Sequence, residues 1–200
     1  GAFRNLAIIA GVNTLLAGAA GGVVAMLYMW WFGPVKKPDP AMSVNGVLAG
    51  LVAVTAPCAF IDTWAAVVIG GVAGVLVIYA TFALEKMKID DPVGAVPVHF
   101  VNGIWGCLAV GIFANANPDT AAWNGVPTAV TGLLYGSSTQ ILAQLAQVVA
   151  IGLTATVLSF GFFKILAAFK LLRSEVAHEL AGLDMPEMGT SGYTTDDIMM

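Results

Sequence analysis

The chain has 200 residues, of which 58% are hydrophobic and only 10% are charged, and its mean hydropathy is +0.87. Soluble domains carry about a quarter charged residues, so this composition excludes an ordinary soluble domain and indicates a membrane protein. The net charge of −4 at pH 7 excludes a basic surface for nucleic acid.

Five apolar runs free of Lys, Arg, Asp and Glu follow one another along the chain. They cover roughly residues 6–33, 41–61, 63–84, 93–115 and 139–163. Each run is close to the ~20 residues that a helix needs to cross a bilayer. The predicted fold class is therefore all-α, a polytopic membrane bundle of about five transmembrane helices. The second and third runs are separated only near Asp62, so they must form an antiparallel hairpin.

Lysine and arginine collect in short cytoplasmic loops, so their positions set the orientation of the bundle. In a five-span arrangement, the breaks on one side of the membrane contain Lys36, Lys37, Lys86, Lys88, Lys170 and Arg173. The breaks on the other side, near Asp62 and at 115–138, contain neither residue type. We therefore expect residues 1–173 to form a multi-pass bundle in the cell (plasma) membrane and residues 174–200 to form a cytoplasmic C-terminal tail.

Pairs of glycines spaced four residues apart lie in the first three runs, at Gly18/Gly22, Gly46/Gly50 and Gly70/Gly74. Small residues at this spacing let the backbones of two membrane helices approach closely. The pattern predicts a densely packed bundle and carries no information about a substrate.

His99 is the only side chain deep within a predicted span that can change charge near neutral pH. Helical spacing places Ala95, Asn102, Gly103 and Gly106 on the same face as His99, which predicts a narrow stripe of small residues around an imidazole. Such a stripe can line a slot through the membrane. A neutral imidazole both donates and accepts a proton, which suits the passage of a small neutral molecule that carries hydrogen atoms, or a proton relay.

Pro97 and an alternative role for the side chain bear on this interpretation of His99. Pro97 lacks a backbone N–H, so one carbonyl in the preceding turn needs another partner or water. The alternative to a pathway residue is a core histidine that is hydrogen-bonded to a neighbouring helix. Both interpretations are open at the level of residue pattern.

Patterns typical of enzymes are absent from the sequence, which has no Gly-x-Ser-x-Gly, His-Glu-x-x-His or phosphate loop and no pair of intramembrane carboxylates. The sequence therefore predicts no enzyme, no cofactor and no metal site. Ion pumps and cation exchangers usually carry a carboxylate in their spans, so a pathway for a neutral species fits better. Thr55, next to Ala56-Pro57 at a predicted helix end, is a further candidate for such a pathway.

The segment Ile89-Asp-Asp-Pro-Val-Gly-Ala-Val-Pro-Val-His99, followed by Asn102-Gly-Ile-Trp-Gly106, strongly resembles the ammonium transporter (Amt/MEP/Rh) family. The resemblance extends to Val12-Asn-Thr, to the run from Asn45 to Cys58, and to Gly182-Leu-Asp184 with Gly189 and Tyr193. It covers nearly the whole chain, in the family's order.

The resemblance implies an eleven-helix subunit of a homotrimer, with an apolar pore through each subunit, of which this chain supplies the last five helices. It implies that His99 is the second of two facing pore histidines. Between them ammonia passes after the ammonium ion loses its proton, and the proton crosses separately. Ala95 matches a pore-lining position, and Thr55 matches a threonine near the pore.

The resemblance also implies regulatory roles at the cytoplasmic face. Asp91 matches a residue that links a loop to the tail, and Gly182 and Asp184 match the tail segment that contacts the neighbouring subunit and helps a PII-type signal protein regulate the pore. The sequence departs from the family pattern at Phe100, where glycine is usual, and at Met188, where histidine is common.

The chain opens without Met and without the first pore histidine, so we expect a fragment of a longer subunit. Two rival functions fit the same residues. One is a membrane ammonium sensor that signals through its tail, and the other is an Rh-type gas or methylamine channel.

Overall fold

The computed structural model describes residues 2–192, and it describes side chains for residues 5–123 and 125–192. Within that range the chain is helical, with no β-strand beyond an isolated bridge between Asn115 and Thr131. The chain consists of two compact units, Gly1–Ala150 and Ile151–Met200, and each is described by itself. The boundary between them falls within the last long helix.

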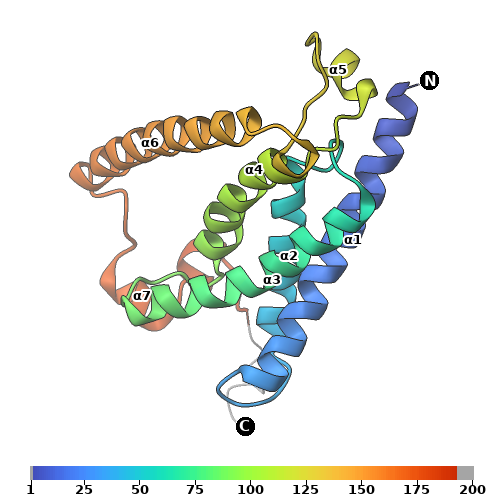
Figure 1. Ribbon diagram of the computed structural model, residues 1–200. Helices are drawn as coiled ribbons and strands as arrows, with labels where there is room; N and C mark the ends of the chain where they lie inside the picture. The colour runs from blue at the N-terminus through green and yellow to red at the C-terminus, as the bar shows by residue number, and fades with distance from the viewer. Residues whose placement is uncertain (1, 193–200) are drawn as a thin grey trace. The chain divides into compact units, whose positions relative to one another are not determined.

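The helices of the first unit begin with α1 (Ala2–Phe32), α2 (Pro40–Thr55) and α3 (Thr63–Lys86). A π-helical turn, η1 (Val96–Val101), leads directly into α4 (Asn102–Phe113). The segment that connects α4 to α6 contains α5 (Pro118–Asn124) and the 3-10 turn η2 (Leu133–Tyr135), and it leads to α6 (Thr139–Ala168). Figure 1 shows α1, α2 and α3 side by side, and α4 packs against both α2 and α3.

Four helical segments of the described chain are long and apolar enough to cross a membrane: Asn5–Phe32, Thr63–Lys86, Val96–Phe113 and Thr139–Ala168. They correspond to the first, third, fourth and fifth predicted spans. The predicted second span, 41–61, was too long, because the apolar helix there has only 16 residues and ends at Thr55. All-α architecture and membrane-spanning helices are confirmed.

Pro57 explains why the second helix ends early. Proline has no N–H for the Ala53 carbonyl, so the regular helical ladder is broken there. One further bond to the residue four positions back, from Cys58 N to Val54 O, is followed by a turn in which Phe60 N donates to Pro57 O. Asn13, fully buried on α1, donates from Nδ2 to the carbonyls of Cys58 (2.8 Å) and Ile61 (3.1 Å). A side chain from α1 thus satisfies carbonyl groups in the turns that follow α2.

Glycine contacts hold the first three helices together. A Cβ atom on Gly70 of α3 would lie 2.1 Å from the Ala17 carbonyl oxygen, and one on Gly50 of α2 would lie 2.2 Å from the same atom. Gly46 and Gly74 make equivalent approaches to Gly21, one turn further along α1. The predicted dense packing is confirmed, and its centre is the backbone of α1.

We expect Gly70→Ala to destabilise the bundle, because real Cβ atoms do not lie 2.1 Å from a carbonyl oxygen and α3 would have to move away from α1. Overpacking of this kind costs about 1–3 kcal/mol. Thermal unfolding in detergent, followed by tryptophan fluorescence, measures the effect. Gly11→Ala on α1 is the control, since a Cβ there would meet nothing within 4 Å. Equal melting temperatures for the two variants would contradict the packing argument.

Asp62, between α2 and α3, anchors the segment that connects α4 to α6. Its carboxylate accepts hydrogen bonds from the Tyr135 hydroxyl and from Asn115 Nδ2, the latter at 2.8 Å. These bonds, the one from Tyr135 foremost, hold the pKa of Asp62 below its ordinary value, and the carboxylate raises the pKa of Tyr135. The segment from 115 to 135 is therefore tied at both ends to one ionised side chain.

The anchor predicts a pH-dependent protease resistance for residues 115–138. A carboxyl group whose folded pKa is lowered stabilises the folded state above its unfolded pKa, about 3.9 for Asp, and loses that effect as pH falls through the folded value. Tyr135→Phe removes the hydrogen-bond donor that lowers the pKa of Asp62 most, so it should accelerate proteolytic cleavage of the segment at pH 7. The increase in cleavage rate on acidification should then be smaller than in the wild type. Asp119→Asn, in the same segment, is the control, and equal cleavage of all three proteins would exclude the anchor.

Candidate functional site

The segment between α3 and α4 starts with a reversal of the chain. Met87 N donates to Ala83 O and Ile89 N to Leu84 O, and Lys88 takes a left-handed conformation with φ +58°. Asp91 then caps the next helical turn, because its Oδ1 accepts from Ala95 N at 2.8 Å and its Oδ2 from Val96 N at 2.9 Å. A carboxylate at this position satisfies N–H groups that have no intrahelical partner.

Asn45 on α2 contacts this segment at two points. Pro97 lies in the first turn of the helix, where a backbone N–H has no intrahelical acceptor. The Val93 carbonyl precedes that turn, and Asn45 Nδ2 donates to it at 3.4 Å. Gly94, with φ +73°, lies against the same amide, since a Cβ there would be 2.7 Å from Asn45 Nδ2. The Val93 carbonyl thus belongs to the segment before the helix, and a side chain of the neighbouring helix is its partner.

The turn that carries His99 is π-helical rather than α-helical. At the end of the turn, the backbone N–H of Asn102 donates to the His99 carbonyl, and its side-chain Nδ2 donates to the Pro97 carbonyl at 2.9 Å. The Asn102 side chain is 0% exposed, whereas that of His99 is exposed. The prediction that His99, Asn102 and Gly106 share one face was wrong, because the π turn inserts an extra residue into the helical register.

His99 lies on the uncovered side of the turn, with Ala95, also exposed, one turn before it. A Cβ on Gly103 would meet nothing within 4 Å, so the space beside His99 is open in this chain. The imidazole makes no hydrogen bond to another residue in the part of the chain that the structure describes. The neighbouring Phe100 is 57% exposed, so its bulk crowds no helix contact within the chain.

Thr55 does not meet His99. Ala53 on α2 lies level with Gly106 on α4, because a Cβ on Gly106 would be 2.5 Å from the Ala53 carbonyl oxygen. Thr55 is two residues beyond that level and His99 seven residues before it, a separation of about 13 Å along the helix axes at 1.5 Å per residue. The Thr55 hydroxyl donates to Leu51 O at 2.7 Å, within its own helix.

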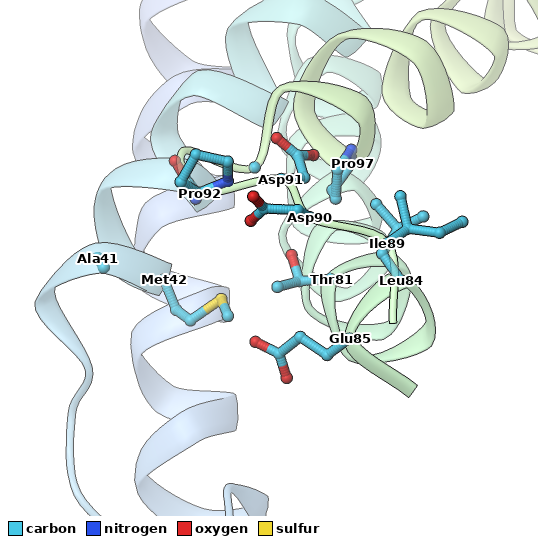
Figure 2. A pocket seen from close by; sticks show the side chains of 12 residues that line it. Ala41, Met42, Thr81, Leu84, Glu85, Ile89, Asp90, Asp91, Pro92 and Pro97 are labelled. Carbon is cyan, nitrogen blue, oxygen red and sulfur yellow. The ribbon is translucent and has the colours of Figure 1, made fainter. Parts of the chain in front are cut away.

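A cavity of about 350 Å³ lies where α2 begins, α3 ends and the segment 89–97 passes between them. Figure 2 shows Thr81 and Glu85 of α3 pointing toward Met42 of α2, with Asp90 reaching in from the connecting segment. The cavity therefore carries carboxylates at the end of the bundle that bears the lysines. No group of three or more metal-ligating side chains occurs among the described residues.

The second unit places the two predicted tail residues in a locally folded segment. Gly182 follows α7 (Val176–Ala181) with φ +98°, and Asp184 begins the π turn η3 (Asp184–Met188), where its Oδ2 accepts from Gly192 N at 3.2 Å. Arg173 donates two hydrogen bonds to the Glu179 carboxylate, at 2.8 and 2.9 Å, which lower the pKa of that group.

Met188, where the sequence departs from the family pattern, is exposed, and the tail around it still forms local hydrogen bonds. The hydroxyl of Ser174 donates to the Glu187 carboxylate, and Gly189 N to Met185 O. Tyr193, part of the resemblance, lies outside the described residues.

The sequence interpretation missed the positioning roles of Asn45 and Asn102. Polar side chains within apolar runs were a usable signal, because backbone carbonyls without a helical partner need such side chains as donors in a membrane. The capping role of Asp91 was also detectable, since an aspartate just before an apolar helix is a typical N-terminal signal. The π turn itself has no sequence signature of comparable strength.

These features define a multi-pass α-helical membrane protein with a histidine-bearing turn held at both ends. The sequence model of the Ammonium Transporter Family matches residues 2–193, and the chain belongs to that family. It is 42% identical over 181 residues to the ammonium transporter Amt2 of Archaeoglobus fulgidus, covering 90% of this chain and 38% of that protein. It is 32% identical over 190 residues to an ammonium transporter of Bacillus subtilis, covering 94% of this chain and 45% of that one.

Solved structures give the same result. The chain matches Mep2 of Saccharomyces cerevisiae with a TM-score of 0.75 at 30% identity, covering 86% of this chain and 38% of that one. It matches a structure described as a sensor Amt protein with a TM-score of 0.72 at 32% identity, covering 90% and 41%. The chain therefore spans about two fifths of the length of these relatives.

We expect Asp91→Ala to loosen the start of the His99 turn, because the N–H groups of Ala95 and Val96 lose their acceptor. Loss of a capping side chain costs about 1 kcal/mol, which corresponds to roughly fivefold faster local hydrogen exchange. Exchange of the 95–96 amides, followed by mass spectrometry, measures this. Asp90→Ala is the matched control, because no hydrogen bond of its side chain is seen in the described chain. Equal exchange in both variants would rule out the cap.

Proposed function

We propose that the intact subunit carries ammonium across the plasma membrane through an apolar pore in which His99 is one of two facing histidines. The ammonium ion gives up its proton, ammonia passes the histidine pair, and the proton crosses separately. The chain's other histidine, His178, belongs to α7 of the tail, so the partner of His99 comes from another part of the subunit.

The observation that carries this proposal is the exposure of His99 on a membrane helix. An imidazole is too short to reach the interface, and a polar group facing lipid is costly. A surface with open space at Gly103 and an ionisable side chain therefore suits a protein-lined pathway. The family membership and the relatives named ammonium transporters support ammonium as the substrate.

The proposal includes the assembly and its regulation. We assign residues 1–173 to the membrane bundle of a homotrimeric subunit and residues 174–200 to a cytoplasmic tail. Ala95 lines the pore one turn before His99, and Thr55 lies near it further along. Asp91, Gly182 and Asp184 belong to the cytoplasmic face, where a PII-type signal protein is the proposed regulator. Gly182 has φ +98°, a conformation that other residues rarely adopt, which supports a specific need for glycine at this position.

We expect His99→Leu in the intact protein to lower ammonium flux per molecule by about a hundredfold, within the range that a positioned proton-transfer group contributes, or to alter selectivity. Uptake into proteoliposomes, with ammonium and methylammonium compared, measures both. His178→Leu is the control, because it removes the other histidine of this chain outside the bundle. Wild-type flux and selectivity in His99→Leu would disprove the pore role.

A membrane ammonium sensor is the second candidate, favoured by the match to the structure described as a sensor Amt protein. Such a protein binds ammonium and signals through its tail without appreciable flux. The proteoliposome measurement separates the two functions, since a sensor would bind ammonium and give no uptake.

A further inference from the structure

A wholly buried side chain of this chain determines where His99 points. Asn102 is 0% exposed, its Nδ2 donates to the Pro97 carbonyl at 2.9 Å, and its Oδ1 has no hydrogen-bond partner in the part of the chain that the structure describes. Burying an amide that is only partly satisfied is unfavourable. A residue of this kind needs a compensating role, and its bond to the Pro97 carbonyl indicates what that role is.

A regular α-helix would direct His99 to the wrong side. At 100° per residue, positions 99 and 106 differ by 700°, so they would lie within about 20° of each other on the helix face. Gly106 packs against the Ala53 carbonyl of α2, because a Cβ there would lie 2.5 Å from that oxygen. In an uninterrupted helix the imidazole would therefore point into the interface with α2.

The π turn prevents that orientation. One additional residue in the turn rotates the preceding part of the helix by about 100° relative to α4. The consequence is visible in the burial pattern, since Val98, Asn102 and Gly106 are buried whereas Ala95 and His99 are exposed. The direction of the imidazole thus depends on whether the turn between Val96 and Val101 stays π-helical.

Asn102 lies where the π turn changes to α-helix, and it serves both sides of the junction. Its backbone N–H binds the His99 carbonyl, three residues back, while its side chain binds the Pro97 carbonyl, five residues back. An apolar side chain at this position would leave the Pro97 carbonyl without the side-chain donor, in an environment with little or no water. Pairing that carbonyl with the backbone again favours the α-helical register.

We propose that Asn102 is a positioning residue, whose amide keeps the turn π-helical and thereby holds the His99 imidazole on the pore side. The inference rests on the proposed function only for its consequence in transport, because the geometry of the turn can be measured separately. Asp91 fixes the start of the same turn through the N–H groups of Ala95 and Val96, so the turn is held at both ends.

The experiment compares Asn102→Leu with Asn13→Leu in the intact protein. Asn13 is a matched control, because it is also 0% exposed, also has an Oδ1 without a partner among the described residues, and donates to carbonyls outside the His99 turn. Ammonium flux per folded molecule in Asn102→Leu should fall about tenfold or more, with an altered ratio of ammonium to methylammonium flux. Asn13→Leu should lower the melting temperature and keep the wild-type ratio.

An electron cryomicroscopy structure of each variant tests the orientation directly. In Asn102→Leu the helix should be α-helical from Ala95 onward, with His99 turned toward α2. A retained π turn with His99 on its original side would overturn the inference, whatever the transport result. If wild-type protein shows no flux, the proposed function fails and the structural comparison still decides the role of Asn102.

A second pair of variants covers the case in which Asn102→Leu fails to fold. Asn102→Gln keeps an amide donor, whereas Asn102→Asp keeps the size of the side chain and, when ionised, loses the donor. We expect the flux ratio and the π turn to be closer to wild type in Asn102→Gln. Wild-type behaviour in Asn102→Asp would contradict the proposed donor role.

Discussion

The structure depends on one close contact, the approach of α2 and α3 to the backbone of α1 at Ala17 and Gly21. In a bilayer no hydrophobic force drives helices together, so close van der Waals packing has to do so, and glycine permits it. Once α2 is fixed against α1, Ala53 presents its carbonyl to Gly106 and thereby sets the place of α4. The turn that carries His99 is continuous with α4, so its position follows from glycine contacts made elsewhere.

Carbonyl groups without a helical partner are the second constraint, because lipid offers no water to satisfy them. Three asparagines of the first unit solve this problem in the same way. Asn13 binds the carbonyls of Cys58 and Ile61 after α2, Asn45 binds the Val93 carbonyl before the His99 turn, and Asn102 binds the Pro97 carbonyl within it. In each case the amide binds a carbonyl where regular α-helix begins, ends or changes to a π turn.

The helices were predictable from sequence because length, hydropathy and glycine spacing are local properties. The end of α2 was not placed correctly, since an apolar run continues past Pro57 although the helix does not. Asn102 and Gly106 were assigned to the His99 face wrongly because the expected spacing was 3.6 residues per turn, and one π turn changes the register of every residue before it. The tie between Asp62 and Tyr135 joins residues 73 positions apart, a pairing that no local pattern contains.

An exposed surface in this chain has two different meanings, and side-chain chemistry distinguishes them. The exposed residues of the long helices are mostly apolar, such as Leu15 on α1 and Tyr79 and Val72 on α3, and lipid or protein can cover them at little cost. His99 is different, because its imidazole has two polar nitrogens and no hydrogen bond within the described chain. Lipid would leave both nitrogens unsatisfied, so this face requires a covering that offers polar partners or a polar substrate. A turn held by Asp91 and Asn102 keeps the imidazole on that face, at the cost of an interrupted α-helical register and a half-satisfied amide. This arrangement is what the proposed role of His99 requires, because it sets the direction of the imidazole at the expense of a regular helix.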